Sequence, residues 1–160
     1  MKTLFDSFDL LTKLLTFGII MDSKLVLSSA QAQTSVATHD STNVLDFGAA
    51  DPNTGTGSPL WITVACQTAL SGASGTTLQV KVMHATSAAG TYACLFETPV
   101  FTNSNFTGTA SIFQTATGEI LINQPLPAAH RRALKVQYVI GTTVMASGAW
   151  DAYIHQGGAS

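Results

Sequence analysis

Residues 134–140, Leu-Lys-Val-Gln-Tyr-Val-Ile, decide the fold class of this chain. Apolar side chains at every second position alternate with Lys135 and Gln137. A period of two puts one row of side chains on a buried face and the other on an exposed face, as in an antiparallel sheet. The same alternation recurs at residues 60–67, 78–82 and 150–155, and shorter strand candidates lie at 44–47, 92–96, 111–114 and 119–122.

Stretches rich in Gly, Pro, Asn and Ser separate these candidates, at residues 51–59, 71–75, 87–90 and 102–108. Turn signals at short intervals between about eight strands are typical of a β-sandwich, and most simply of a jelly roll. We therefore predict an all-β, antiparallel jelly roll over residues 34–160. An N-terminal arm, helical or extended, is predicted over residues 1–33.

The arm carries an apolar stripe at helical spacing, formed by Leu4, Phe5, Phe8 and Leu11 together with Leu15 and Ile19. A segment this short is marginal alone, so it needs a surface to lie on, either its own domain or a neighbouring molecule. We take the four residues nearest the N-terminus as candidate partner contacts. Whether translation starts at Met1 or at Met21 stays open.

The same segment does not fit an export signal or a membrane span. Asp6, Asp9 and Lys13 interrupt the apolar core of about 7–15 residues that a signal peptide needs. No run reaches the roughly 20 apolar residues that cross a bilayer. We therefore expect neither secretion nor a membrane partner.

Composition favours contact with other protein molecules. Charged residues make up 10% of the 160 residues, against about 25% in ordinary domains. A surface with few charges repels its neighbours weakly, which suits a packed assembly. The net charge of −2 and the scattered basic residues lack the basic stripe of a nucleic-acid-binding protein.

Motifs for catalysis or metal binding are absent from the sequence. His39-Asp40-Ser41 contains the residue types of a catalytic triad, but adjacency in sequence is not triad geometry. Glu97 and Glu119 are the only glutamates, and nothing in the sequence brings them together as a glycosidase pair. No histidines have the spacing of a metal site. We predict no catalytic residue, no metal site and no cofactor.

Two further features concern cysteine and arginine. Cys66 and Cys94 lie in apolar strand candidates, and we favour two buried thiols over a disulfide. Arg131 and Arg132 directly precede the strand at 134–140. They either protect that strand from aggregation or form ion pairs with an acidic patch on a partner.

One stretch carries a family resemblance: Leu-Ile-Asn-Gln-Pro-Leu-Pro-Ala-Ala-His-Arg-Arg-Ala-Leu-Lys-Val-Gln-Tyr-Val-Ile-Gly at residues 121–141, followed by Ala-Ser-Gly-Ala-Trp at 146–150. An apolar strand, a Pro-Leu-Pro turn, a basic residue, an aromatic-bearing strand and a closing small-residue strand follow in order. This order resembles the capsid cement, or decoration, proteins of short-tailed double-stranded-DNA phages. The similarity spans about residues 22–155, and residues 1–20 have no counterpart in it.

The resemblance implies a jelly roll on the outer surface of a mature capsid, where it clamps neighbouring major capsid protein subunits. It also implies a homo-oligomer, a dimer more often than a trimer, in a virion assembled in the host cytoplasm. The alternative is a carbohydrate- or receptor-binding β-sandwich of a phage fibre or a secreted lectin-like protein. Trp61 and Tyr153, on strand faces predicted to point outward, would then stack on sugars, whereas in a capsid protein they would lie at a subunit interface.

Overall fold

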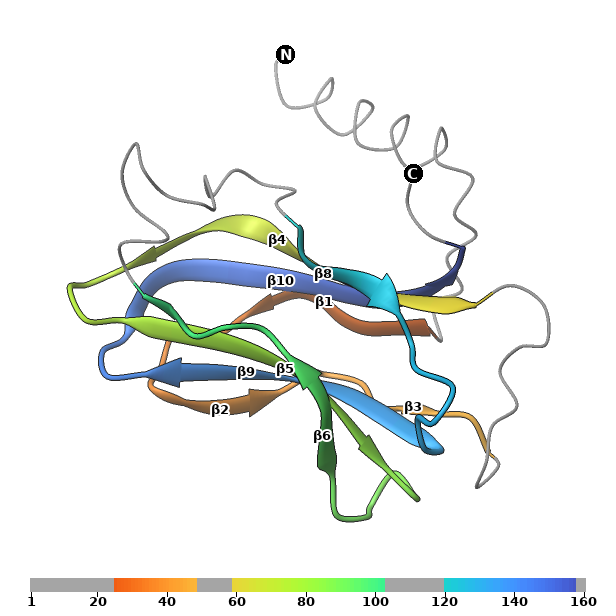
Figure 1. Ribbon diagram of the computed structural model, residues 1–160. Coiled ribbons are helices and arrows are strands. Elements are labelled where there is room, and N and C mark those ends of the chain that lie inside the picture. Colours follow the sequence, from red (N-terminus) through yellow and green to blue (C-terminus); the bar gives the residue numbers. More distant parts are fainter. Residues whose placement is uncertain (1–24, 49–58, 103–119, 158–160) are drawn as a thin grey trace.

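The computed structural model describes residues 25–48, 59–102 and 120–157, which form two antiparallel sheets packed face to face (Figure 1). Sheet A has the order β1-β10-β4-β8, with bounds Val26–Ala32, Met145–Gln156, Leu60–Gly72 and Ile120–Pro125. Sheet B has the order β2-β9-β5-β6, with bounds Ala37–Asp40, Ala133–Gly141, Thr77–Ala85 and Ala93–Glu97. Two short strands complete sheet B, β3 at Leu45–Asp46 and β7 at Phe101–Thr102.

These ten segments fill eight strand positions. β2 and β3 pair with successive parts of β9, and β6 and β7 pair with successive parts of β5. Each sheet therefore has four strand positions. The chain crosses from one sheet to the other after β1, β3, β4, β7, β8 and β9. Two four-stranded antiparallel sheets linked in this way form a jelly roll, which confirms the predicted fold class.

The sandwich core consists of the side-chain rows that the alternation predicted. Leu134, Val136 and Tyr138 of β9 are fully buried, as are Ile62 and Val64 of β4 in the opposite sheet. Large aromatic residues join the two layers, because the ring of Tyr138 in sheet B stacks on that of Trp150 in sheet A with a centroid distance of 4.8 Å. Burial of these rows is the main stabilising term of such a sandwich.

The sandwich begins earlier in the chain than residue 34. β1 pairs with β10, with Val26 opposite Tyr153 and Gln31 opposite Trp150, and its Leu27 lies in the core. Residues 26–32, which the predicted division assigned to the arm, thus form an edge strand of sheet A. The short apolar pair Leu27 and Val26 is too brief for alternation to reveal this strand from sequence.

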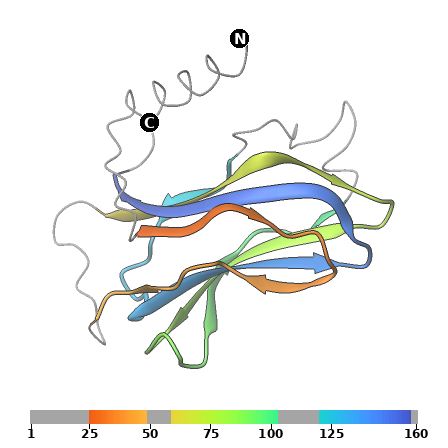
Figure 2. The same ribbon diagram turned by 180° about the vertical axis from the view of Figure 1, so that it is seen from behind.

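One lateral edge of the sandwich is closed by hydrogen bonds between β1 and the β2–β3 segment (Figure 2). The amide of Gln31 donates to the carbonyl of Asp40 at 2.7 Å and accepts from the backbone of Thr42 at 2.8 Å. Asn43 donates from its backbone to Leu27 and from its side chain to Val26. These bonds protect the edge strand β1 from pairing with another chain.

The two cysteines lie in different sheets and are not joined in a disulfide. Cys66 on β4 is buried in the core, as predicted. Cys94 on β6 is exposed, so the prediction that both thiols are buried was wrong for this residue. β6 is an edge strand whose partner is β5 alone, which leaves less of its surface covered.

Candidate partner-binding surface

The described charges are distributed unequally between the two sheets. Sheet A carries a single charged side chain, Asp151 on β10, and its Oδ1 accepts a hydrogen bond from the backbone of Ala30. All other charged residues of the described ranges belong to strands or turns of sheet B: Asp40, Asp46, Lys81, Glu97, Arg131, Arg132 and Lys135. The outer face of sheet B is therefore charged, and the outer face of sheet A is nearly uncharged.

On the outer face of sheet B, Lys135 and Asp40 form the most embedded ion pair. Lys135 Nζ lies 2.7 Å from Asp40 Oδ2 and 4.2 Å from the centroid of the Tyr92 ring, and Gln137 donates to the other carboxylate oxygen. Partial burial alone would raise the pKa of Asp40, but the hydrogen bonds from Lys135 and Gln137 outweigh it and lower that pKa below its ordinary value. The pair is therefore satisfied within the molecule.

The two adjacent arginines have different environments. Arg132 forms a bidentate pair with Asp46, with Nε 2.6 Å and Nη2 3.0 Å from the two carboxylate oxygens. This pairing lowers the pKa of Asp46. Arg131 is exposed, and its backbone amide donates to Nδ1 of His84 at 3.2 Å. Only Arg131 thus keeps a guanidinium directed to solvent without an ion pair to any described carboxylate.

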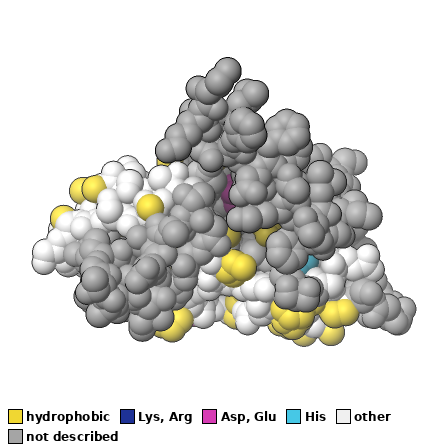
Figure 3. Space-filling view, turned by 90° about the horizontal axis from the view of Figure 1, so that it is seen from above, with side chains coloured by type: hydrophobic (Ala, Val, Ile, Leu, Met, Phe, Trp, Pro, Cys, Tyr) yellow, Lys and Arg dark blue, Asp and Glu magenta, His cyan; other side chains and the backbone are white. Residues whose placement is uncertain are grey.

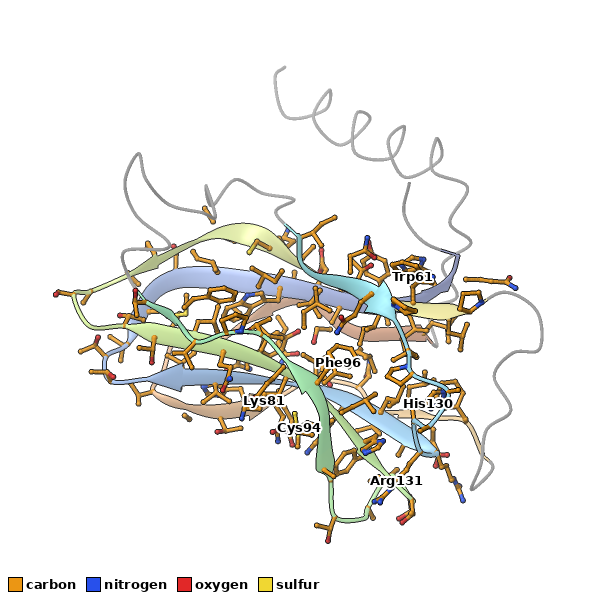
Figure 4. All side chains as sticks on the ribbon, in the orientation of Figure 1. Trp61, Lys81, Cys94, Phe96, His130 and Arg131 are labelled. Carbon is orange, nitrogen blue, oxygen red and sulfur yellow. The ribbon has the colours of Figure 1, made fainter. Side chains whose placement is uncertain are left out.

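A third pair lies on β5 and β6, next to the exposed thiol. Lys81 Nζ is 2.8 Å from Glu97 Oε2, and this contact raises the pKa of Lys81 and lowers that of Glu97. Partial burial, together with the neighbouring carboxylate, raises the pKa of Cys94. A raised pKa leaves little thiolate near neutral pH, so Cys94 lacks the environment of a nucleophile. Figure 4 shows Lys81, Cys94 and Arg131 on the sheet B side, with Trp61 on the other.

The outer face of sheet A is uncharged over most of its described area. Strand register places Trp61 opposite His155 and Thr63 opposite both Tyr153 and Asn123, all on the side away from the core. We call Trp61, Thr63, Asn123, Tyr153 and His155 the outer aromatic cluster. Figure 3 views the molecule from this side, and none of the described side chains visible there is Lys or Arg.

The outer aromatic cluster is held by a buried hydrogen-bond chain. Thr63 Oγ1 donates to Asn123 Oδ1 at 3.1 Å and lies 2.9 Å from His155 Nε2. Because the single hydroxyl proton goes to Asn123, Nε2 of His155 acts as the donor to Thr63. Burial lowers the pKa of His155 and raises that of Tyr153, so both are held neutral.

The predicted sugar-stacking residues belong to this cluster. Trp61 and Tyr153 do face outward, and the structure brings them onto neighbouring strands. Both are only partly exposed, and the Tyr153 ring lies against that of His155 at a centroid distance of 5.7 Å. A sugar platform needs an open ring face, which neither residue offers in full.

A small cleft opens at the other lateral edge, between β6–β7 and β8. It measures about 210 Å³ and is lined by residues 96–99 and 121–124, with Glu97 as the one ionisable lining group. Glu97 is already paired with Lys81.

The described residues hold no group of three or more His, Cys, Asp or Glu that could bind a metal ion. They also include no helix long and apolar enough to cross a membrane. The predicted contacts Leu4, Phe5, Phe8 and Leu11 lie outside the described residues, so their role stays a prediction. The strand candidate at residues 111–114, Glu119 and the alternative start at Met21 also lie outside the described residues.

Comparison with known families fits this architecture. The sequence model of the Bbp16 family matches residues 27–154, from the second residue of β1 to a point two residues before the end of β10. The chain belongs to the Bbp16 family. The family is associated with bacteriophages, and its match covers the jelly roll and leaves out the first 26 residues. No curated protein matches the chain.

Sequence reasoning missed the internal partners of the charged and polar groups. Asp46, which neutralises Arg132, is 86 residues away in sequence and lies in a two-residue strand. Thr63 and His155 lie in the outward rows of their strands but are buried there. No local pattern encodes these contacts, because they depend on strand register.

Proposed function

We propose that this Bbp16-family protein is a virion structural protein that binds the outer surface of the capsid. It joins neighbouring major capsid protein subunits and so stabilises the mature shell. It acts by contact, without catalysis or a cofactor, as a homo-oligomer, for which a dimer is favoured and a trimer is the alternative. The phage association of the family supports the virion assignment.

The observation that carries the proposal is the unequal charge of the two sheets. The cations of sheet B are paired within the molecule with the sole exception, among described residues, of Arg131, and sheet A is nearly uncharged. Interfaces are depleted of Lys, Glu and Asp and enriched in aromatic residues and Arg. The outer face of sheet A, which is nearly uncharged and carries Trp61 and Tyr153, has the composition of an interface. Arg131 of sheet B adds an arginine that is free to pair with a partner.

The symmetry of a capsid allows a protein to stay bound through several weak contacts. On a capsid each copy contacts several identical neighbours, so modest interfaces add through multivalency. Binding of this kind needs no deep pocket in the protein.

The test is binding to capsids that lack the protein. We expect purified protein to co-sediment with such capsids and to raise the temperature at which they release DNA. Arg131→Glu should weaken co-sedimentation, and the matched variant Arg132→Glu should instead lower the stability of the protein, because it leaves Asp46 facing a second carboxylate. Absence of co-sedimentation, together with binding on a glycan array, would favour the carbohydrate-binding alternative.

A further inference from the structure

The main chain of Arg131 is held on both sides by histidine side chains. Its N–H group donates to Nδ1 of His84, near the end of β5, at 3.2 Å. Its carbonyl oxygen lies 3.0 Å from Nδ1 of His130, in the turn that precedes β9. Figure 4 shows His130 and Arg131 at the end of the sandwich where β5 ends. The two contacts fix the point from which the Arg131 side chain extends into solvent.

The two contacts require opposite protonation states of the two Nδ1 atoms. A backbone N–H group can only donate, so Nδ1 of His84 carries no proton while this bond exists. A carbonyl oxygen can only accept, so Nδ1 of His130 carries a proton. Both nitrogens of a charged imidazole are donors. Acid therefore leaves the His130 contact intact and abolishes the His84 contact.

The surroundings of His84 disfavour a positive charge on its ring. Burial, followed by the positive charges of Arg131 and His130, lowers the pKa of His84 below 6.5. The bond to Arg131 is thus fully formed above pH 6.5 and is lost as pH falls through the lower folded pKa.

The strands beside β5 do not offset this effect. In strand register His84 lies opposite Leu134 of β9 and Ala93 of β6, which carry no charge. The next residues of those strands, Lys135 and Cys94, are ionisable, but successive side chains of a strand point to opposite faces. The strand neighbours of His84 therefore supply no negative charge that would stabilise a protonated ring.

We propose that His84 is a positioning residue for Arg131 and that acid releases Arg131 from it. The neutral His84 ring holds the Arg131 backbone against the end of β5. The protonated ring loses its acceptor atom and places a second cation beside Arg131, so the turn leaves β5. The consequence for partner binding rests on the proposed function, which assigns the free guanidinium of Arg131 to the capsid contact. Binding through Arg131 should therefore weaken in acid.

The test measures hydrogen exchange of the Arg131 amide by NMR in the full-length protein, at about pH 7.5 and about pH 5, relative to the intrinsic rate at each pH. His84→Asn keeps an acceptor, because its side-chain carbonyl accepts a hydrogen bond and does not titrate. His84→Leu has no acceptor. The matched control is His39→Asn, since His39 on β2 contacts Ser35 and not the turn.

We expect protection of the wild-type Arg131 amide to fall about fivefold between the two pH values, as one hydrogen bond is lost. His84→Leu should show the low protection at both pH values, and His84→Asn the high protection at both. His39→Asn should behave as wild type. The proposal is overturned if wild-type protection is equal at both pH values, or if His84→Asn loses it in acid as wild type does.

Co-sedimentation with capsids at the same two pH values tests the consequence for the partner. Wild type should bind about fivefold more weakly in acid, and His84→Asn should bind equally at both pH values. Equal binding of wild type at both pH values would overturn the link between His84 and the partner contact. Absence of binding at both, with the exchange results as expected, would support the positioning role of His84 and contradict the capsid function.

Discussion

The hydrogen bond between Tyr138 and Ser28 gives the sharpest test of how the two sheets are joined. The hydroxyl of Tyr138 on β9 donates to Ser28 Oγ on β1 at 2.9 Å, and both residues are at most 1% exposed. Ser28 Oγ in turn donates to Gln31 Oε1 at 2.7 Å. Burial raises the pKa of Tyr138 well above its ordinary value, so the hydroxyl keeps its proton and remains a donor.

Tyr138→Phe and Ser28→Ala should lower the free energy of unfolding by different amounts. In Tyr138→Phe the phenyl ring can still stack on Trp150 and Ser28 still donates to Gln31, so the loss is that of one hydrogen bond, about 1 kcal/mol. In Ser28→Ala the Tyr138 hydroxyl stays buried without an acceptor, and Gln31 Oε1 keeps only the backbone amide of Thr42 as a donor. This larger penalty is about 1–3 kcal/mol. The double variant should cost about 1 kcal/mol less than the sum of the two.

Urea unfolding measures all three variants. We expect the midpoint for Tyr138→Phe to fall by roughly 0.3–1 M with an unchanged slope. Tyr92→Phe is the matched control, since its hydroxyl donates to Ala88 at an exposed position and its loss should cost less than about 0.5 kcal/mol. Equal costs for the two Tyr→Phe variants, or strict additivity with Ser28→Ala, would refute a buried bond between the sheets.

Three further predictions concern titration and thiol access. The folded pKa of Asp40 lies below 3.8, so its stabilising effect is complete above that value and is lost as pH falls through the lower folded pKa. Lys135→Met should reduce this acid-dependent loss, as measured by thermal unfolding between about pH 6 and pH 2, at a cost near neutrality of about 0–1 kcal/mol. The folded pKa of His155 lies below 6.5, so stability should decline as pH falls through 6.5 toward the lower folded pKa, and His155→Gln should flatten that decline. A maleimide should label Cys94 in the folded protein and Cys66 only after unfolding, and labelling of both at equal rates would contradict the assigned burial.

The strands that carry the core were predictable because their signal is local. Alternation at residues 60–67, 78–82, 134–140 and 150–155 predicted inward rows that are buried in β4, β5, β9 and β10. β3 lies within the strand candidate at residues 44–47, but β1 and β2 gave no such signal, since short edge strands have few inward residues. Their places are set by pairing with β9 and β10, which lie more than 80 residues further along the chain.

The candidate site was less predictable, for the same physical reason. Arg131 and Arg132 are indistinguishable in sequence, yet β3 brings Asp46 to Arg132 and leaves Arg131 unmatched by any described carboxylate. Trp61 and Tyr153 were correctly expected to face outward. Their contact with a buried Thr63–His155 pair depends on the register of β4 against β10, which composition does not encode.

The low charge of the chain acquires a different meaning once its distribution is known. A uniformly sparse surface would simply reduce repulsion between copies. Here the described charges gather on sheet B, where paired cations and anions cancel at short range, and sheet A retains only Asp151. The charged face of sheet B therefore stays solvated, and the nearly uncharged face of sheet A can exclude water when it contacts another protein surface. The two faces of this jelly roll therefore have separate tasks, and substitutions on sheet A should affect packing contacts, whereas those on sheet B should affect pH dependence.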